Sequence, residues 1–225
     1  MQVEIGYRPS QSMARVLLQP GESIVAESGA MVGMSTNVQM QTQSGGMMAG
    51  LKRMFGGESF FRNTFTAAQT EGEVYFATPL CGDMITLDMT PTGYFVQSSS
   101  YVAGSPQVNI ETKVGGFKSF FAGEGVFVLK ATTQVPGQQL ILGAFGGIQE
   151  IQCDGRMIID TGHLVAWDAN LQYKVTKAAD GWIASFLSGE GLVCDFEGTG
   201  RIWIQTRNPS EYGSTIGRLL PPRRQ

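Results

Sequence analysis

The sequence predicts an all-β protein built from three tandem β-sandwich units of about 66 residues each. The first observation is a short stretch that recurs three times at a constant spacing. A fixed long period is the signature of a repeated structural unit. The second observation is composition: 30 glycines and only 16% charged residues accompany many short apolar runs. That combination is typical of short strands joined by tight turns.

The recurring stretch has eight positions and ends in a Gly-Glu pair. Its glycines are separated by 123 − 57 = 66 and 189 − 123 = 66 residues. Apolar residues at its first, fourth and fifth positions lie on one face of a helical turn, and the glycine is suited to end that turn. Each unit is therefore expected to contain a short helical turn. The three copies are Leu51–Glu58, Phe117–Glu124 and Ile183–Glu190.

Strand patterns repeat in the same order around this stretch. In the first unit, Val38, Met40 and Thr42 alternate with glutamines, which is the pattern of a strand with one solvated face. In the third unit, Asp154-Gly155 is predicted to be a turn between two strands. No linker composition separates the units, so we expect them to pack as one body. Their predicted ranges are 1–72, 73–145 and 146–225, the last including a C-terminal tail.

The two ends of the chain give further expectations. Pro209 and Glu211 are suited to the first turn of a helix, which is predicted to continue to Leu220. The N-terminal residues lack a basic start followed by an apolar stretch, so no secretory signal is predicted. The longest apolar runs are far below the ~20 residues of a membrane-spanning helix.

Cysteine usage and charge indicate the compartment and the partners. The three cysteines are an odd number, so at least one is a free thiol, which suits a reducing compartment. We therefore expect a cytoplasmic protein. The net charge of −3 gives no general attraction to nucleic acid, which we do not expect as a partner. The cysteines are Cys81, Cys153 and Cys194.

Tandem β units also predict self-association. Unpaired strand edges tend to pair with other chains. Three units side by side cover the internal edges and leave two outer edges open. Head-to-tail association of identical chains covers the outer edges and can close into a ring. We therefore predict a cyclic homo-oligomer, with a trimer as the preferred size.

Several stretches resemble a known family: Glu27–Val32, Gly57–Phe61, Asp160–Trp167, Ser188–Val193 and Gly198–Thr206. They are similar to the bacterial branch of the altered-inheritance-of-mitochondria (mitochondrial biogenesis) protein family, and the resemblance covers nearly the whole chain. It implies a fold like that of the tryptophan RNA-binding attenuation protein, made of small sandwich units of the short double-stranded β-helix type. It also implies nine such units in a trimeric ring. It brings no catalytic residues.

Catalytic and metal chemistry find little support in the sequence. His163 is the only histidine, so it cannot form a His-His metal pair. Asp160 and Asp168 are close to it in sequence, but no nucleophile motif accompanies them. A structural histidine at the start of a strand is the favoured interpretation. We expect no enzymatic activity, no cofactor and no metal site.

The Gly-Glu pairs have two interpretations. The glutamates Glu58, Glu124 and Glu190 follow Gly57, Gly123 and Gly189 at the same position of every unit. They could form three equivalent ligand or ion sites. Alternatively, each carboxylate accepts hydrogen bonds from the backbone amides of its own turn. Placement at the same position in every unit favours the structural role.

Met47 and Met48 form the most distinctive candidate contact. They precede the cations Lys52 and Arg53 and lie outside the eight aligned positions. Flexible apolar side chains beside cations suit a protein partner or a membrane surface. The neighbouring apolar residues of the repeat are instead assigned to the core. A peripheral partner or membrane contact at Met47, Met48, Lys52 and Arg53 is therefore one hypothesis.

These observations favour a non-enzymatic, ring-forming scaffold or interaction protein that binds other proteins. The alternative is a small-molecule-binding ring that holds its ligands between adjacent β units.

Overall fold

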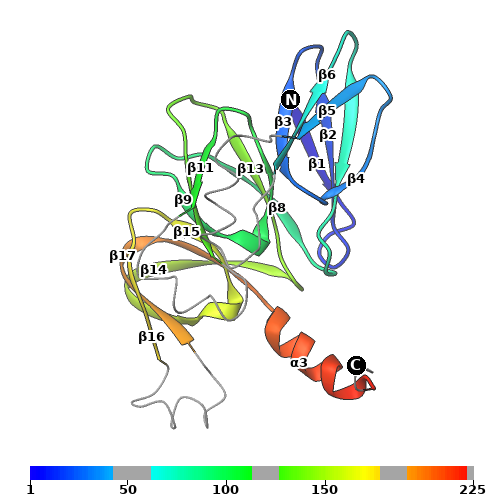
Figure 1. The fold of residues 1–225 in the computed structure, drawn as a ribbon. Helices are drawn as coiled ribbons and strands as arrows, with labels where there is room; N and C mark the ends of the chain where they lie inside the picture. The colour runs from blue at the N-terminus through cyan, green and yellow to red at the C-terminus, as the bar shows by residue number, and fades with distance from the viewer. Residues whose placement is uncertain (43–61, 113–126, 178–191, 222–225) are drawn as a thin grey trace.

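The computed structural model is all-β apart from one short helix at the C-terminal end (Figure 1). It describes residues 1–42, 62–112, 127–177 and 192–221. Within these ranges, strands β1 to β17 form three antiparallel sheets. The predicted all-β class is therefore confirmed. The predicted helical turns at 51–58, 117–124 and 183–190 lie outside the described residues.

The three sheets differ in size, and the strands of each follow one another in space in the order below. The four-stranded sheet contains β1 (Gln2–Gly6), β2 (Met13–Leu18), β7 (Gly72–Phe76) and β4 (Met31–Met34). The six-stranded sheet contains β5 (Val38–Thr42), β6 (Arg62–Ala67), β3 (Ser23–Glu27), β10 (Tyr101–Gly104), β13 (Gln139–Gly143) and β8 (Met84–Asp88). The seven-stranded sheet contains β11 (Asn109–Thr112), β12 (Val128–Thr132), β9 (Tyr94–Gln97), β15 (Leu164–Asp168), β17 (Leu192–Gln205) and β14 (Ile148–Asp160), with β16 (Gln172–Lys177) also paired to β17.

Alternate residues of each strand face the same side of its sheet. The inward-facing apolar residues form three clusters along the molecule. The first cluster joins the four-stranded sheet to β3 and β6, and its Phe65 and Phe76 rings meet edge to face at 5.4 Å. The second cluster joins β8, β10 and β13 to β9 and β12, around Tyr94 and Leu129. The third cluster lies on β14, β15 and β17, around Phe196.

The longest pairing joins β14 to β17 from Ile148↔Gln205 to Asp160↔Val193. The turn predicted at Asp154-Gly155 is wrong, because β14 continues through it as one strand. Gly155 lies opposite Gly198, and both have positive φ angles, of 100° and 122°. Glycine adopts these angles without a steric penalty. The ladder therefore continues through a local distortion where the sequence pattern suggested a chain reversal.

The predicted C-terminal helix is confirmed as α3 (Pro209–Leu219). The Asn208 side chain accepts hydrogen bonds from the amides of Ser210 and Glu211 at 3.0 and 3.4 Å, which caps the helix start. The helix extends away from the sheets, as Figure 1 shows. Its Tyr212 ring contacts Phe145 with centroids 5.0 Å apart, and no residue of α3 is buried.

We expect Gly82→Ala to destabilise the fold. Gly82 forms a parallel bridge with Gly146, and a Cβ atom at Gly82 would lie 1.8 Å from the carbonyl oxygen of Ala144. Overpacking against backbone typically costs about 1–3 kcal/mol. Urea denaturation should show this loss. Gly6→Ala is the matched control, since its nearest atom would be 4.0 Å away. Equal stability of the two variants would refute the prediction.

Candidate interaction surface

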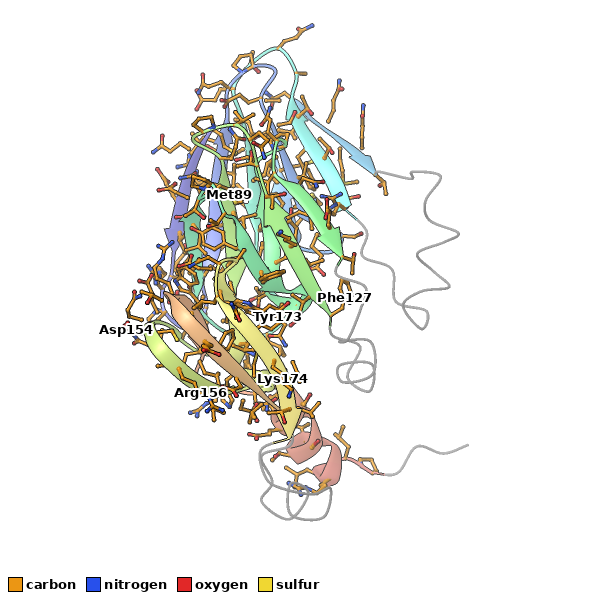
Figure 2. The ribbon with its side chains drawn as sticks, turned by 90° about the vertical axis from the view of Figure 1, so that its left-hand side faces the viewer. Met89, Phe127, Asp154, Arg156, Tyr173 and Lys174 are labelled. Carbon is orange, nitrogen blue, oxygen red and sulfur yellow. The ribbon has the colours of Figure 1, made fainter. Side chains whose placement is uncertain are left out.

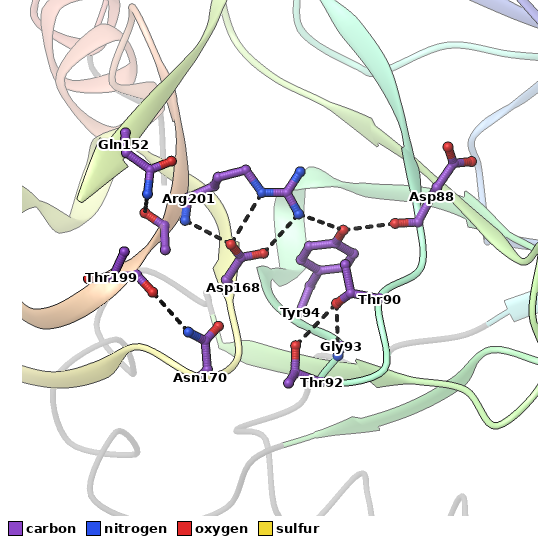
Figure 3. A network of polar contacts seen from close by, with 11 residues as sticks. Asp88, Thr90, Thr92, Gly93, Tyr94, Gln152, Asp168, Asn170, Thr199 and Arg201 are labelled. Atoms are coloured by element: carbon purple, nitrogen blue, oxygen red, sulfur yellow. Dashed lines mark hydrogen bonds and ion pairs between the residues drawn. The ribbon is translucent and has the colours of Figure 1, made fainter. Parts of the chain in front are cut away.

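A polar network holds β9, β15 and β17 together (Figure 3). The Asp168 carboxylate accepts hydrogen bonds from the backbone amide of Arg201 at 2.8 Å and from its guanidinium at 3.1 and 3.2 Å. The guanidinium also donates to the Tyr94 hydroxyl at 3.2 Å, and that hydroxyl donates to the carbonyl oxygen of Asp88 at 2.8 Å. Burial raises the pKa of Tyr94. The network acts as a structural clamp across the joint between β9 and β15.

An aromatic cluster packs on the other face of the same joint, as part of the third apolar cluster. Phe95 of β9 lies directly opposite Trp167 of β15, and their ring centroids are 5.6 Å apart. Tyr173 of β16 packs on both rings, at 5.2 Å from Phe95 and 5.1 Å from Trp167. Phe95 and Trp167 are only 9% and 1% exposed. Where two strands of distant sequence meet inside the chain, apolar contact thus covers the joint.

The β4 end of the molecule lacks such a cover within the described residues. The side chains of Met31, Val32 and Met34 are exposed along β4. Beside them lies a pocket of about 390 Å³ that includes Glu27 and Tyr101 in its lining. Burial raises the pKa of Glu27 to about 7. This end of the molecule therefore combines an open strand edge with a titratable carboxyl group.

The second half of β14 is also open on its outer side among the described strands. Its Ile158 is 59% exposed, which is high for an isoleucine in a strand. Arg156 forms a bidentate pair with Asp195 at 2.8 and 2.7 Å, and this pairing lowers the pKa of Asp195. Figure 2 shows Arg156 on β14 and Tyr173 on β16. An apolar side chain is thus presented beside a solvated ion pair.

The residues singled out from the sequence are placed only in part. His163 lies in the described chain, where its Nδ1 atom is 2.7 Å from the carbonyl oxygen of Gln205. A hydrogen bond there requires the proton on Nδ1 and joins the start of β15 to the end of β17. The other candidates lie outside the described residues: Met47, Met48, Lys52, Arg53, Gly57, Glu58, Gly123, Glu124, Gly189 and Glu190.

Sequence reasoning missed the open faces of β4 and β14. The alternation of apolar residues indicates which side of a strand is inward, but it does not show which edge lacks a partner. One signal in the sequence could have pointed to these faces. Valines occur at 32, 102 and 165, one in each predicted unit, and each is the residue skipped in the pairing of its strand.

The chain folds as an all-β protein of three antiparallel sheets, with open edges at β4 and β14 among the described strands. The chain belongs to the family described as Mitochondrial biogenesis AIM24, whose sequence profile matches residues 3–207. An uncharacterized protein of Streptococcus pyogenes serotype M6 is 32% identical over 221 residues, which cover 93% of this chain and 87% of that protein.

A crystal structure of a Streptococcus pyogenes protein is similar in fold, with a TM-score of 0.82 and 27% sequence identity. The match covers 97% of this chain and 99% of that one. The family membership expected from the sequence is therefore confirmed. Among the helices in the described ranges, none has the length and apolarity needed to cross a membrane.

We expect Glu27 to make stability depend on pH. Its pKa is about 7 in the folded chain against an ordinary 4.5, so folding favours the protonated form. This contribution is complete below about pH 4.5 and is lost as the pH rises through about 7. Urea denaturation at pH 5 and pH 8 should show a drop in wild-type stability of about 1–3 kcal/mol from this group.

The Glu27→Gln variant should lack this part of the pH dependence, since the amide stays neutral at both pH values. Glu111→Gln, at an exposed strand position, should keep it. An identical difference between pH 5 and pH 8 in wild type and Glu27→Gln would show that burial does not control the ionisation of Glu27.

Proposed function

We propose that this protein is a non-enzymatic scaffold that assembles into a closed homotrimeric ring. Each chain contributes three equivalent β units: β2 to β7, β8 to β13, and β14 to β17. Assigning β7 (Gly72–Phe76) to the first unit is part of this proposal, whereas the sequence alone predicted a boundary at 72. The likeness to the ring-forming attenuation protein belongs to the same proposal.

Recurrent contacts support the three units. β4, β10 and β15 each skip one residue after their first pair with a neighbouring strand, so each has a β-bulge at the same place. Near the end of each of these strands, a side-chain oxygen accepts a hydrogen bond from a backbone amide of the neighbouring strand, which is β7, β13 or β17. These bonds join Ser35 to Glu73 at 2.9 Å, Ser105 to Gln139 at 3.0 Å and Asp168 to Arg201 at 2.8 Å.

The main support for the ring is a difference between strand edges. The edges between units inside the chain are paired, whereas, within the described ranges, the corresponding edges at the two ends of the chain are not. Inside the chain, β10 pairs with β3 of the preceding unit, and β15 pairs with β9 in the same way. Among the described strands, β4 has no such preceding partner and the second half of β14 has no such following partner. One chain therefore ends in two complementary edges. A second copy can satisfy each of them, and repetition closes a ring.

A non-enzymatic role is supported by how the charged groups are used. Arg201, Asp168 and Tyr94 are bonded to one another at the joint. They hold strands in place, as structural networks do. Cys81, Cys153 and Cys194 are free thiols, which supports the proposed cytoplasmic location. The scaffold would present the outer surface of the ring to protein partners.

The alternative function is a small-molecule-binding ring with ligands between adjacent units. The pocket beside Glu27 favours it, because residues of the first unit and Tyr101 of the second unit both line that pocket. A partly buried carboxyl group and nearby apolar side chains suit a small ligand with one polar group.

Native mass spectrometry should give a species of three times the 24.3 kDa chain mass. A trimer without additional mass supports the scaffold. A trimer that carries a discrete additional mass supports the small-molecule alternative. A species at the mass of one chain, at micromolar concentration, would remove the ring and the proposed function with it.

The partner or membrane contact at Met47 and Met48 remains a prediction. If this segment contacts membranes, the wild-type protein should float with liposomes, and Met47→Ser/Met48→Ser should reduce the floating fraction several-fold. Val135→Ser is the control, because it changes an exposed apolar residue outside the proposed contacts. Absence of the wild-type protein from the floating fraction rejects membrane contact.

A further inference from the structure

One valine position behaves differently in the three proposed units. Val102 follows the first paired residue of β10 and packs in the first apolar cluster, among residues of the preceding unit. Val165 has the same place in β15 and packs in the second cluster, again that of the preceding unit. They are 2% and 0% exposed. Val32 has this place in β4 but is 59% exposed.

The third cluster is the one that receives no such valine within the described chain. Its Met157 and Ile159, on the second half of β14, are only partly buried. The corresponding residues of β3 and β9 are fully buried, because Ile24 and Ala26 have no exposed area and Tyr94 and Val96 have almost none. An exposed valine and an incompletely covered cluster thus lie at opposite ends of one chain.

The two internal joints define how those ends would meet. At the first joint, Ala103 lies opposite Ala26 and Gly104 opposite Val25. At the second joint, Ala166 lies opposite Val96 and Trp167 opposite Phe95. The shared bulges align Gly33 with Ala103 and Ala166, so Met34 aligns with Gly104 and Trp167.

Chain spacing aligns the partner strand in the same way. Gln97 lies four residues before Tyr101, and Asp160 lies four residues before Leu164, with a short 3-10 turn in each interval. Ile159 therefore aligns with Val96, and Ile158 aligns with Phe95. The same antiparallel register would place Gly33 of one copy opposite Ile159 of the next copy, and Met34 opposite Ile158.

The side chains at these positions are apolar and uncovered. In the proposed contact, Ile158 is equivalent to Phe95 of the second joint, and Met34 is equivalent to Trp167. Met40 takes the place of Tyr173, because Met40 pairs with Phe65 as Tyr173 pairs with Phe196. Met34 is 38% exposed and Met40 is 45% exposed. The three residues thus match the aromatic cluster that seals the second joint, and in a single chain they face solvent.

We propose that β4 of one copy pairs antiparallel with the second half of β14 of a second copy, with Met34 opposite Ile158 and Val32 inserted into the third apolar cluster. This inference rests on the proposed ring and identifies its contact. The pairing satisfies backbone groups along both open edges. It also buries four apolar side chains: Val32, Met34, Met40 and Ile158.

A disulfide across the contact tests the register. Residues directly opposite in an antiparallel pair have Cβ atoms about 4.5–5.5 Å apart, close to the range that a disulfide can bridge. Met34→Cys/Ile158→Cys should be made in a Cys81→Ser background, because Cys81 is exposed whereas Cys153 and Cys194 are buried. Mild oxidation should give a covalent trimer on a non-reducing gel, and reductant should return it to single chains.

The controls separate this contact from other modes of association. On the same non-reducing gel, each single-cysteine variant should run as one chain. A mixture of the two variants should give a covalent dimer and no covalent trimer. Val135→Cys/Ile158→Cys should not cross-link, since Val135 is an exposed apolar residue away from β4. A trimer by native mass that forms no Met34–Ile158 cross-link would overturn the pairing and leave the ring. A single chain by native mass would overturn both.

A charge at the inserted valine gives an independent readout. In a dilution series followed by light scattering, the Val32→Asp ring should dissociate at a protein concentration at least tenfold higher than the wild-type ring does. Because Val32 is exposed in the single chain, the Val32→Asp variant should keep the circular dichroism spectrum of the folded protein. Val135→Asp should leave the assembly intact. Wild-type assembly by Val32→Asp would contradict the insertion of Val32.

Discussion

The backbone of a strand at a sheet edge carries N–H and C=O groups that need partners, and the fold is organised by how this need is met. Inside the chain, β10 and β15 each add to a sheet begun by earlier strands. The six- and seven-stranded sheets therefore each join strands that lie far apart in the sequence. The joints that result are the places where side chains from different parts of the chain meet.

The two internal joints use different side chains at the same positions. Val25 faces Gly104 across the first joint, and a Cβ at Gly104 would lie 2.9 Å from a Leu140 methyl group. Phe95 faces Trp167 across the second joint, with the Tyr173 ring against both. The pairing of the backbones is constant while the side-chain volume varies. The strand register, rather than a fixed set of side-chain contacts, thus defines the joint.

The all-β class and the C-terminal helix could be predicted from sequence, because alternation and capping are local signals. Met13–Leu18 alternates clearly, and Asn208 followed by Pro209 favours a helix start. The continuous strand through Gly155 could not be predicted, because the same Asp-Gly pair also suits a turn. Its outcome depends on Gly198 on the partner strand. The open edges at β4 and β14 are likewise set by long-range pairing, and the residues chosen from the repeat lie outside the described ranges.

The proposed contact between copies differs from the second internal joint in its charge. At that joint, Arg201 and Asp168 form an ion pair that also engages Tyr94. At the proposed contact, Glu73 is equivalent to Arg201, Ser35 to Asp168 and Met157 to Tyr94. Glu73 is already bonded to Arg15 and Tyr75 of its own sheet.

Strand pairing and apolar burial are therefore the forces available to join two copies. Salt screens exposed charges but has little effect on apolar burial. Hydrophobic association also weakens on cooling. A ring held in this way should keep its mass at high ionic strength, whereas a ring joined through surface ion pairs such as Arg156–Asp195 would dissociate. The physical character of the contact thus distinguishes the β4–β14 joint from association through the charged face beside it.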